Sequence, residues 1–159
     1  MREEILVLNE LTVNYKIAGQ GPAILILHGW GRGSGSYGEV MKGIAQEGYT
    51  IVVPDLPGFG KSEPPKTAWG VKEYVDFVKM FAEHLNLGNF VLLGHSFGGQ
   101  IALKFALQYP QKPRGLILYA AAAIRRDPAP EKKALTVVAK VGNAVFSLFP
   151  LSLCQPLLR

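Results

Sequence analysis

One short stretch of the sequence combines a nucleophilic side chain with the glycines that a sharp turn requires. The stretch is Gly94 to Gly99, GHSFGG, and it lies between an apolar run at 89–93 and an apolar-periodic run at 100–109. This order of strand, turn and helix is the context of the G-x-S-x-G nucleophile elbow. The glycines let strand and helix pass closely, and unpaired N–H groups at the helix N-terminus can stabilise an oxyanion. We therefore predict that Ser96 is a catalytic nucleophile; a glycine-rich turn whose serine only caps a helix is the alternative.

The length and composition are those of a folded domain. The chain has 159 residues, of which 48% are hydrophobic and 18% charged, and a domain typically takes about 100–200 residues. The single cysteine, Cys154, forms no internal disulfide and gives no metal-ligand spacing, so we predict no metal and no cofactor. Residues 1–4 lack the cationic and apolar order of a signal peptide, and we expect a cytoplasmic protein.

The net charge of +5 is distributed unevenly along the chain. Residues 1–96 contain 8 Lys/Arg and 10 Asp/Glu, whereas residues 97–159 contain 9 and 2. The basic residues between 125 and 133 suit an acidic partner or an anionic lipid, but a solvated surface is the favoured interpretation. No aromatic interleaving or nucleic-acid motif accompanies them, so we predict no nucleic-acid partner.

Apolar patterns predict the elements that must position Ser96. In the second of two N-terminal strands, apolar residues alternate with an exposed face of Thr12, Asn14 and Lys16. Later apolar runs are unbroken, which is typical of strands buried on both faces. The predicted strands are 5–8, 11–18, 23–27, 50–53, 89–93 and 115–120. The predicted helices are 37–45, ended by Gly48, then 71–85, closed by Gly88, and 100–109.

Strand and helix alternate from residue 23 onward. This predicts an α/β fold, a mostly parallel sheet with helices on both faces, preceded by an N-terminal antiparallel hairpin. The residue pattern changes after Ala123, where a charged, proline-containing linker is followed by a segment that is apolar on nearly every side. We therefore assign 1–124 to the core and 125–159 to the start of a helical cap or lid. The segment 134–158 approaches the length of a transmembrane span, about 20 apolar residues, but Lys140 and two prolines argue against one. Binding to a membrane surface is the minority alternative.

Two glycine-rich segments also resemble phosphate-binding loops. Residues 33–38 match G-x-G-x-x-G, with Asp55 at the end of the next predicted strand, as in a dinucleotide site. The first glycine of that motif should follow its strand directly, whereas residues 28–32 intervene here. The block ending at 60–62 fails as a P-loop, because Asp55 stands where the first glycine should be and prolines break the helix that should follow.

Three motifs occur in one order, the 28–31 loop with sequence HGWG, the 55–62 block and the 94–99 turn. Together they resemble the α/β-hydrolase superfamily, and the loop looks like that of small carboxylesterases. The resemblance implies a serine hydrolase that transfers the acyl group of a small carboxylic ester or related substrate to water. It also implies that the N–H groups of Phe97 and Trp30 bind the oxyanion and that Gly29 lines the substrate site.

The sequence departs from this superfamily in the general base. The superfamily order is serine, acid, histidine, but no histidine follows Ser96, and only Asp127 and Glu131 follow it as acids. We therefore expect the chain to be the N-terminal part of a longer enzyme whose triad acid and histidine lie beyond Arg159.

The three histidines present are not expected to replace that base. His28 and His95 are expected to hydrogen-bond loop backbone, and His84 to lie on the surface. We therefore expect little hydrolase activity from the chain alone, and self-association through the apolar segment 134–158. A non-catalytic binding or regulatory module that retains the hydrolase pocket is the alternative function.

Overall fold

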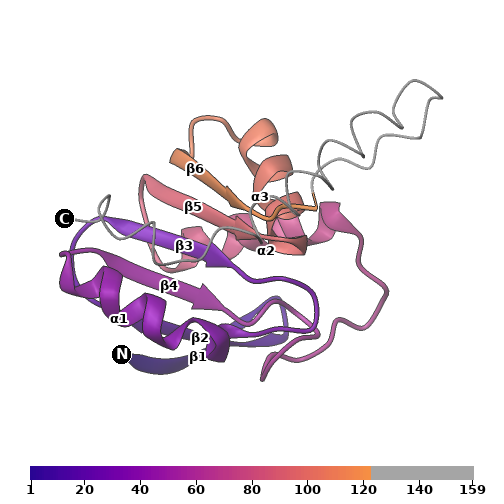
Figure 1. Cartoon of the computed structure of the whole chain (residues 1–159). Helices are drawn as coiled ribbons and strands as arrows, with labels where there is room; N and C mark the ends of the chain where they lie inside the picture. Colours follow the sequence, from indigo (N-terminus) through magenta and orange to yellow (C-terminus); the bar gives the residue numbers. More distant parts are fainter. Residues whose placement is uncertain (123–159) are drawn as a thin grey trace, which may run out of the picture. The chain divides into compact units, whose positions relative to one another are not determined.

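The computed structural model describes residues 1–122, which form one mixed sheet flanked by helices (Figure 1). Within this range the sheet has six strands in the order β1-β2-β4-β3-β5-β6. The strands are β1 (Arg2–Leu8), β2 (Leu11–Ala18), β3 (Ala23–Leu27), β4 (Thr50–Pro54), β5 (Phe90–His95) and β6 (Pro113–Tyr119). The helices are η1 (Ser34–Tyr37, 3-10), α1 (Gly38–Gln46), α2 (Val71–His84) and α3 (Phe97–Gln108). The predicted α/β fold is confirmed.

The predicted N-terminal hairpin is present, but one of its side chains lies in an unexpected place. β1 and β2 pair antiparallel around Asn9 and Glu10, which both have positive φ. β2 then pairs antiparallel with β4, and β4, β3, β5 and β6 are mutually parallel. The prediction that Asn14 faces solvent is wrong: it is 3% exposed, because its amide binds a buried carboxylate described below.

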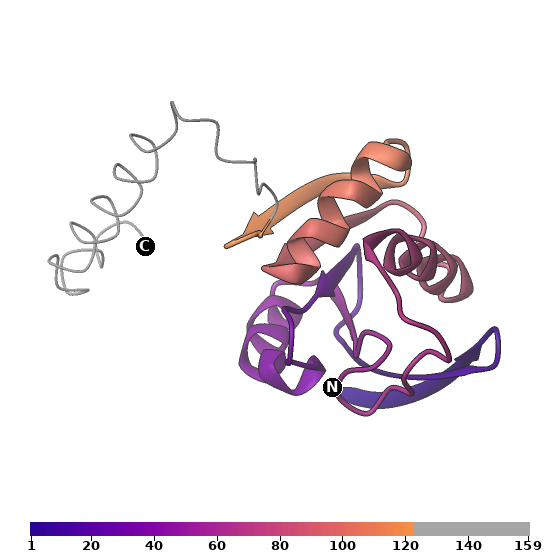
Figure 2. The same ribbon diagram turned by 90° about the vertical axis from the view of Figure 1, so that its right-hand side faces the viewer.

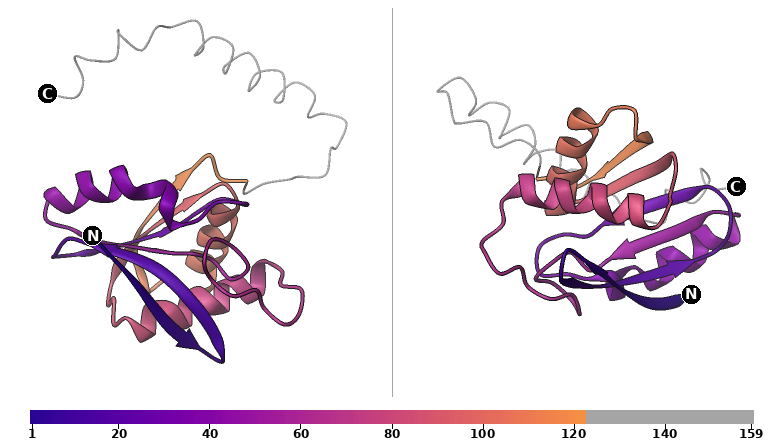
Figure 3. Two further views of the ribbon diagram at one scale, coloured as in Figure 1. Left: turned by 90° about the horizontal axis from the view of Figure 1, so that it is seen from below. Right: turned by 180° about the vertical axis from the view of Figure 1, so that it is seen from behind.

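The two central strands are buried on both faces, as predicted. Successive side chains of a strand point to opposite faces, and β3 divides accordingly. Ile24 and Ile26 pack with Met41 of α1 on one face, whereas Leu25 and Leu27 join the cluster formed by α2 and α3 on the other. Figure 3 shows α1 on one side of the sheet and α2 and α3 on the opposite side, and Figure 2 shows α2 and α3 adjacent.

α2 begins at the predicted residue, Val71, and ends one residue before the predicted end at 85. Its first turn is held by the Glu73 carboxylate, which accepts the Gly70 N–H at 2.8 Å. The helix ends at His84, four residues before the predicted closing residue, Gly88. Asn86 and Gly88 both adopt positive φ and carry the chain into β5. Two left-handed residues therefore make this exit, where the sequence pattern indicated one.

β6 is the edge strand of the sheet within residues 1–122. The run at 115–120 has the apolar pattern of a buried strand, but Ile117 and Tyr119 are 48% and 66% exposed, in keeping with its place at the edge. Within the same range, no helix is long and apolar enough to cross a bilayer. The predicted cap at 125–159 and the apolar segment 134–158 lie outside the described residues.

Candidate active site

Ser96 is the single residue that connects β5 to α3. Its backbone adopts φ +51° and ψ −111°, a sparsely populated conformation that costs a non-glycine residue about 1–3 kcal/mol. Two backbone hydrogen bonds to the end of β6 hold it there. The Ser96 N–H donates to the Tyr119 carbonyl and the Ser96 carbonyl accepts the Ala122 N–H, each at 3.1 Å. The segment at the end of β6 therefore fixes the strained turn.

The glycines around Ser96 are required by close backbone contacts. A Cβ atom added at Gly94 would lie 2.5 Å from the Gly98 carbonyl oxygen, and one added at Gly98 would overlap the Leu27 carbonyl. A Cβ at Gly99 would lie 2.5 Å from the Ala121 Cβ. Strand and helix thus pass as closely as the sequence predicted, with no room for side chains at these positions.

Unpaired N–H groups point out of the same turn. The first four N–H groups of a helix have no intrahelical acceptor, and Phe97 is the first residue of α3. The next two donors after Gly98 are satisfied, because the N–H groups of Gly99 and Gln100 both donate to the Ser96 carbonyl. Within residues 1–122, no acceptor is bonded to the N–H groups of Phe97 and Gly98 beside the serine.

The loop after β3 crosses directly over this turn. A Cβ added at Gly29 would lie 3.1 Å from the His95 Nδ1 and 3.3 Å from the Ser96 Cβ. β3 leads to α1 on one face of the sheet and β5 leads to α3 on the other, and such a switch point at the carboxyl ends of parallel strands is where α/β sheets bind ligands. The structure thus brings together Gly29, Trp30, Ser96 and Phe97, all four predicted site residues.

Three aromatic side chains from separate segments pack together beside Ser96. The Trp30 ring centroid lies 4.9 Å from that of Phe59 and 5.3 Å from that of Phe97, in edge-to-face geometry. Tyr74 supports Phe97 from α2 at 5.2 Å. The Trp30 side chain nevertheless remains 71% exposed. Sequence reasoning did not identify Phe59 or Tyr74 as part of the site, because only the fold brings their segments to it.

The three histidines do not provide an evident general base. His28 is fully buried; its Nδ1 lies 2.8 Å from the Gly29 carbonyl, and its Nε2 accepts the Leu56 N–H at 2.9 Å. Nδ1 therefore carries the proton, and burial lowers the pKa of His28 below its ordinary value. The predicted backbone bonding of His28 and the predicted exposure of His84 are confirmed. His95 instead packs against Tyr119 at 5.2 Å, and the predicted bond to the loop backbone is not formed within residues 1–122.

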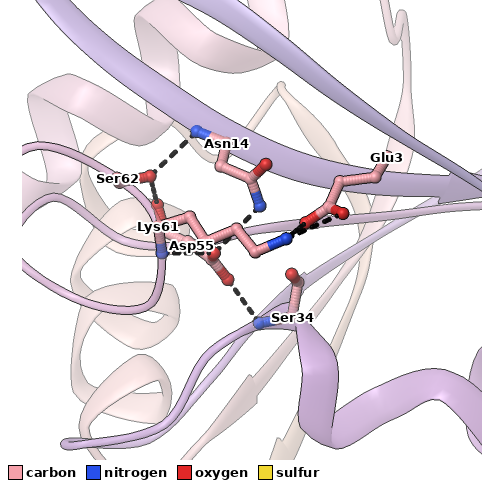
Figure 4. Close-up of polar contacts among 6 residues, drawn as sticks. All are labelled: Glu3, Asn14, Ser34, Asp55, Lys61 and Ser62. Carbon is pink, nitrogen blue, oxygen red and sulfur yellow. Dashed lines mark hydrogen bonds and ion pairs between the residues drawn. The ribbon is translucent and has the colours of Figure 1, made fainter.

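A buried carboxylate links β2 to the loops after β3 and β4 (Figure 4). Asp55, 3% exposed, accepts the Ser34 N–H, the Lys61 N–H at 2.9 Å and the Asn14 amide at 3.0 Å. Ser62 completes the group, since its hydroxyl donates to the Asp55 carbonyl and accepts the Asn14 N–H. Burial raises the pKa of Asp55, but the N–H donors outweigh burial and hold the pKa below its ordinary value. These five residues are called the Asp55 cluster below.

The Asp55 cluster also bears on the alternative that the glycine-rich segment 33–38 binds the phosphates of a dinucleotide. The loop at 33–36 borders a hollow of about 300 Å³ that Asp55 and Lys61 also line. The N–H groups of Ser34 and Lys61 are already bound to the Asp55 carboxylate, and a phosphate placed on this loop would meet that negative charge. This geometry argues against a dinucleotide site. No group of three His, Cys, Asp or Glu residues within the described range is placed to hold a metal ion.

Comparison with known proteins is consistent with this geometry. The family model of the alpha/beta hydrolase fold matches residues 22–148. An uncharacterized protein of Mycobacterium tuberculosis is 37% identical over 113 residues, covering 71% of this chain and 33% of the relative. The 2-hydroxy-6-oxo-6-phenylhexa-2,4-dienoate hydrolase of Burkholderia cepacia is 34% identical over 122 residues, covering 70% and 40%.

A solved structure extends the likeness to three dimensions. The crystal structure of a membrane phospholipase A, described as a bacterial virulence factor, matches with a TM-score of 0.70 and 29% identity, over 74% of this chain and 38% of that one. The chain thus spans between a third and two fifths of the length of these relatives. With the family model covering most of its residues, the chain belongs to the alpha/beta hydrolase fold family.

Proposed function

We propose that this chain carries the nucleophile and the oxyanion donors of a serine hydrolase that acts on a carboxylic ester or a related acyl substrate. One observation carries the proposal. Ser96 is held in a strained turn at the carboxyl edge of the sheet. Among residues 1–122 the Phe97 N–H beside it has no bonded acceptor, and the 28–31 loop crosses over it.

The chemistry follows from these positions. A general base takes the Ser96 hydroxyl proton as its Oγ attacks the substrate carbonyl carbon, the carbonyl π bond opens, and the carbonyl oxygen becomes an oxyanion. The N–H groups of Phe97 and Trp30 donate to that oxyanion, and removal of one such donor typically costs about 10²–10³-fold in rate. Collapse of the intermediate breaks the ester C–O bond, and the leaving alkoxide takes the proton from the protonated base and departs as the alcohol. Water then hydrolyses the acyl-serine to the carboxylic acid and free Ser96.

A serine hydroxyl needs a base at neutral pH, and none of the three histidines is placed to serve as one. His28 uses both ring nitrogens in the loop, and His84 is exposed on α2. His95 packs against Tyr119. The isolated chain should therefore keep only the residual catalysis that survives loss of triad members, on the order of 10³–10⁴-fold over water.

The surroundings of Ser96 favour an apolar substrate group. Trp30, Phe59 and Phe97 expose ring surface rather than charge beside the serine. Burying such a group against them removes apolar surface from water at about 25 cal/mol per Å². The hydrolase relative and the phospholipase A structure support an acyl substrate of this kind.

Labelling with a fluorophosphonate probe, with imidazole added as an external base, tests the proposal on the 159-residue chain. We expect slow labelling that imidazole accelerates and that Ser96→Ala abolishes. Ser36→Ala is the matched control, because Ser36 is an exposed serine of η1 and its loss should leave labelling unchanged. Labelling that persists in Ser96→Ala, or that is absent at all imidazole concentrations, would overturn the proposed role of Ser96.

The alternative is a binding or regulatory module, which the lack of a histidine placed as a base within residues 1–122 favours. It predicts that an apolar ester or its acid binds without labelling, and that Ser96→Ala binds it as tightly as the unchanged chain. The same experiment therefore separates the two functions.

A further inference from the structure

Two consecutive residues, Asp55 and Leu56, hold both ends of the loop that crosses Ser96. At the start of this 28–34 loop, the Leu56 N–H donates to the His28 Nε2 at 2.9 Å. At its end, the Ser34 N–H donates to the Asp55 Oδ1 (Figure 4). The loop is therefore attached to the first turn after β4 at two points, with Trp30 between them.

The Asp55 side chain has little freedom to move. A Cβ added at Gly60 would overlap its carboxylate, and one added at Gly33 would lie 2.9 Å from its Oδ1. Its own N–H donates to the Asn14 carbonyl at 2.8 Å, which fixes the residue to β2. The carboxylate is thus a rigid acceptor enclosed by backbone, rather than an adaptable surface charge.

Direct participation of Asp55 in acid–base chemistry does not fit these contacts. Its oxygens accept the Ser34 and Lys61 N–H groups and the Asn14 amide, and within residues 1–122 no histidine nitrogen is bonded to it. The nearest imidazole in the loop, that of His28, is occupied by Leu56 and Gly29. What Asp55 controls is the position of the loop.

We propose that Asp55 is a positioning residue that fixes the 28–34 loop, so that the Trp30 N–H stays aligned with the oxyanion formed at Ser96. The proposal rests on the proposed function. Preorganised donors stabilise an oxyanion only when they sit at hydrogen-bonding distance from it, and a displacement of about 1 Å can cost on the order of 10²-fold in rate. Release of one loop end removes that alignment without touching Ser96.

A matched pair of substitutions at one position isolates the Asp55 contact. Ser34→Pro deletes the N–H that binds Asp55, and the site tolerates proline because Ser34 begins η1 and Gly33 before it is extended. Ser34→Ala keeps this N–H and removes only the hydroxyl. Asp55→Asn replaces one carboxylate oxygen by an NH₂ group, so the N–H of either Ser34 or Lys61 loses its acceptor, and the remaining oxygen carries no charge.

The first readout is imidazole-assisted fluorophosphonate labelling over a range of probe concentrations. We expect Ser34→Pro and Asp55→Asn to lower the maximal labelling rate about 10- to 100-fold, with the half-saturating probe concentration unchanged. Ser34→Ala should stay within about twofold of the unchanged chain. Equal maximal rates in Ser34→Pro and Ser34→Ala would overturn the positioning role.

The second readout follows the loop itself and does not depend on catalysis. The chain has two tryptophans, so Trp69→Phe leaves Trp30 as the only indole. In that background, we expect Ser34→Pro and Asp55→Asn to lower the fluorescence anisotropy of Trp30, and Ser34→Ala to leave it unchanged. Unchanged anisotropy in all three variants would overturn the inference. If the unchanged chain is not labelled at all, the proposed function fails, and the anisotropy alone decides whether Asp55 fixes the loop.

Discussion

The turns that follow β4 and β5 lie at the same edge of the sheet but are built in opposite ways. After β4, the Asp55 carboxylate is buried and accepts three donors, and the hydrogen bonds of Ser62 complete the cluster. After β5, Ser96 is strained at φ +51°, and the Phe97 N–H beside it has no intrahelical acceptor.

This contrast shows how one edge of a sheet serves stability and reactivity together. A carboxylate whose oxygens accept several N–H donors makes a rigid support, because charge-assisted hydrogen bonds are stronger than neutral ones. A strained serine beside unpaired donors is costly in the free protein, and a substrate oxyanion would satisfy those donors. The 28–34 loop joins the two turns, since it is bonded to the first and crosses the second.

The largest expected effect on stability comes from adding a side chain at Gly98, where the turn after Ser96 packs closely against the backbone after β3. Gly98→Ala places a Cβ against the backbone carbonyls of Leu27 and His28, and we expect it to lower the free energy of unfolding by about 3 kcal/mol. Gly43→Ala is the control, a helical glycine of α1 with open space around it, and it should stabilise by about 0.5–1 kcal/mol. Urea denaturation followed by circular dichroism measures both; equal stability of the two variants would show that the turn is not tight.

The next largest effect is expected at the turn after β4, where the Asp55 carboxylate accepts its hydrogen bonds. Asp55→Asn should lower the free energy of unfolding by about 2 kcal/mol at neutral pH, because a buried N–H donor loses its charged acceptor.

The pH dependence follows from the pKa of Asp55, which hydrogen bonds hold below its ordinary value although burial raises it. The stability it contributes is present above the unfolded pKa, about 3.9, and is lost as the pH falls through the lower folded pKa. Urea midpoints in acid should therefore fall more steeply for the unchanged chain than for Asp55→Asn. Parallel pH profiles would contradict this origin of the stability.

A smaller effect, of opposite sign, is expected at the strained turn. Ser96→Gly relieves the positive φ and should raise the free energy of unfolding by about 1 kcal/mol, the strain released less the extra chain entropy of glycine. Ser96→Ala keeps the unfavourable backbone and should give no such gain. Both variants lose fluorophosphonate labelling. A Ser96→Gly chain that is less stable than Ser96→Ala would show that the turn is not strained.

The smallest effect is expected on the exposed side of the Asp55 cluster. Lys61 Nζ lies 2.8 Å from a Glu3 carboxylate oxygen, with both side chains open to solvent. Exposed ion pairs contribute little to stability, and the Lys61 N–H stays bound to Asp55 whatever Glu3 becomes. Glu3→Gln should therefore leave the urea midpoint unchanged. A shift comparable with that of Asp55→Asn would mean that the support extends to the surface pair.

Much of the fold could be predicted from local patterns. The strands at 11–18 and 23–27 have the predicted bounds, and the serine turn lies between strand and helix as the glycines indicated. These features depend on alternation, apolar runs and backbone freedom, which are properties of neighbouring residues. The errors occur where contacts between distant segments determine which side chains are buried. Asn14 was predicted to be exposed because nothing near it in the sequence reveals its partner, which is 41 positions away.

The residues of the candidate site likewise divide into those that could be predicted from the sequence and those that could not. Ser96 could be predicted, because a glycine-rich turn between strand and helix places it, and the family resemblance added Phe97, Gly29 and Trp30. The packing of Phe59 against Trp30 and the bond from the Ser34 N–H to Asp55 could not, since no local pattern shows which backbone donor a buried carboxylate will meet.

The sequence by itself thus determined the strand order along the chain, the serine turn and the lack of a histidine after Ser96. Only the tertiary structure decided that Asp55 binds the end of the 28–34 loop and that His28 binds Leu56 rather than a substrate. The physical reason is that helices, strands and turns arise from interactions along the chain, whereas a buried polar group must find its partners among whichever segments the sheet brings together.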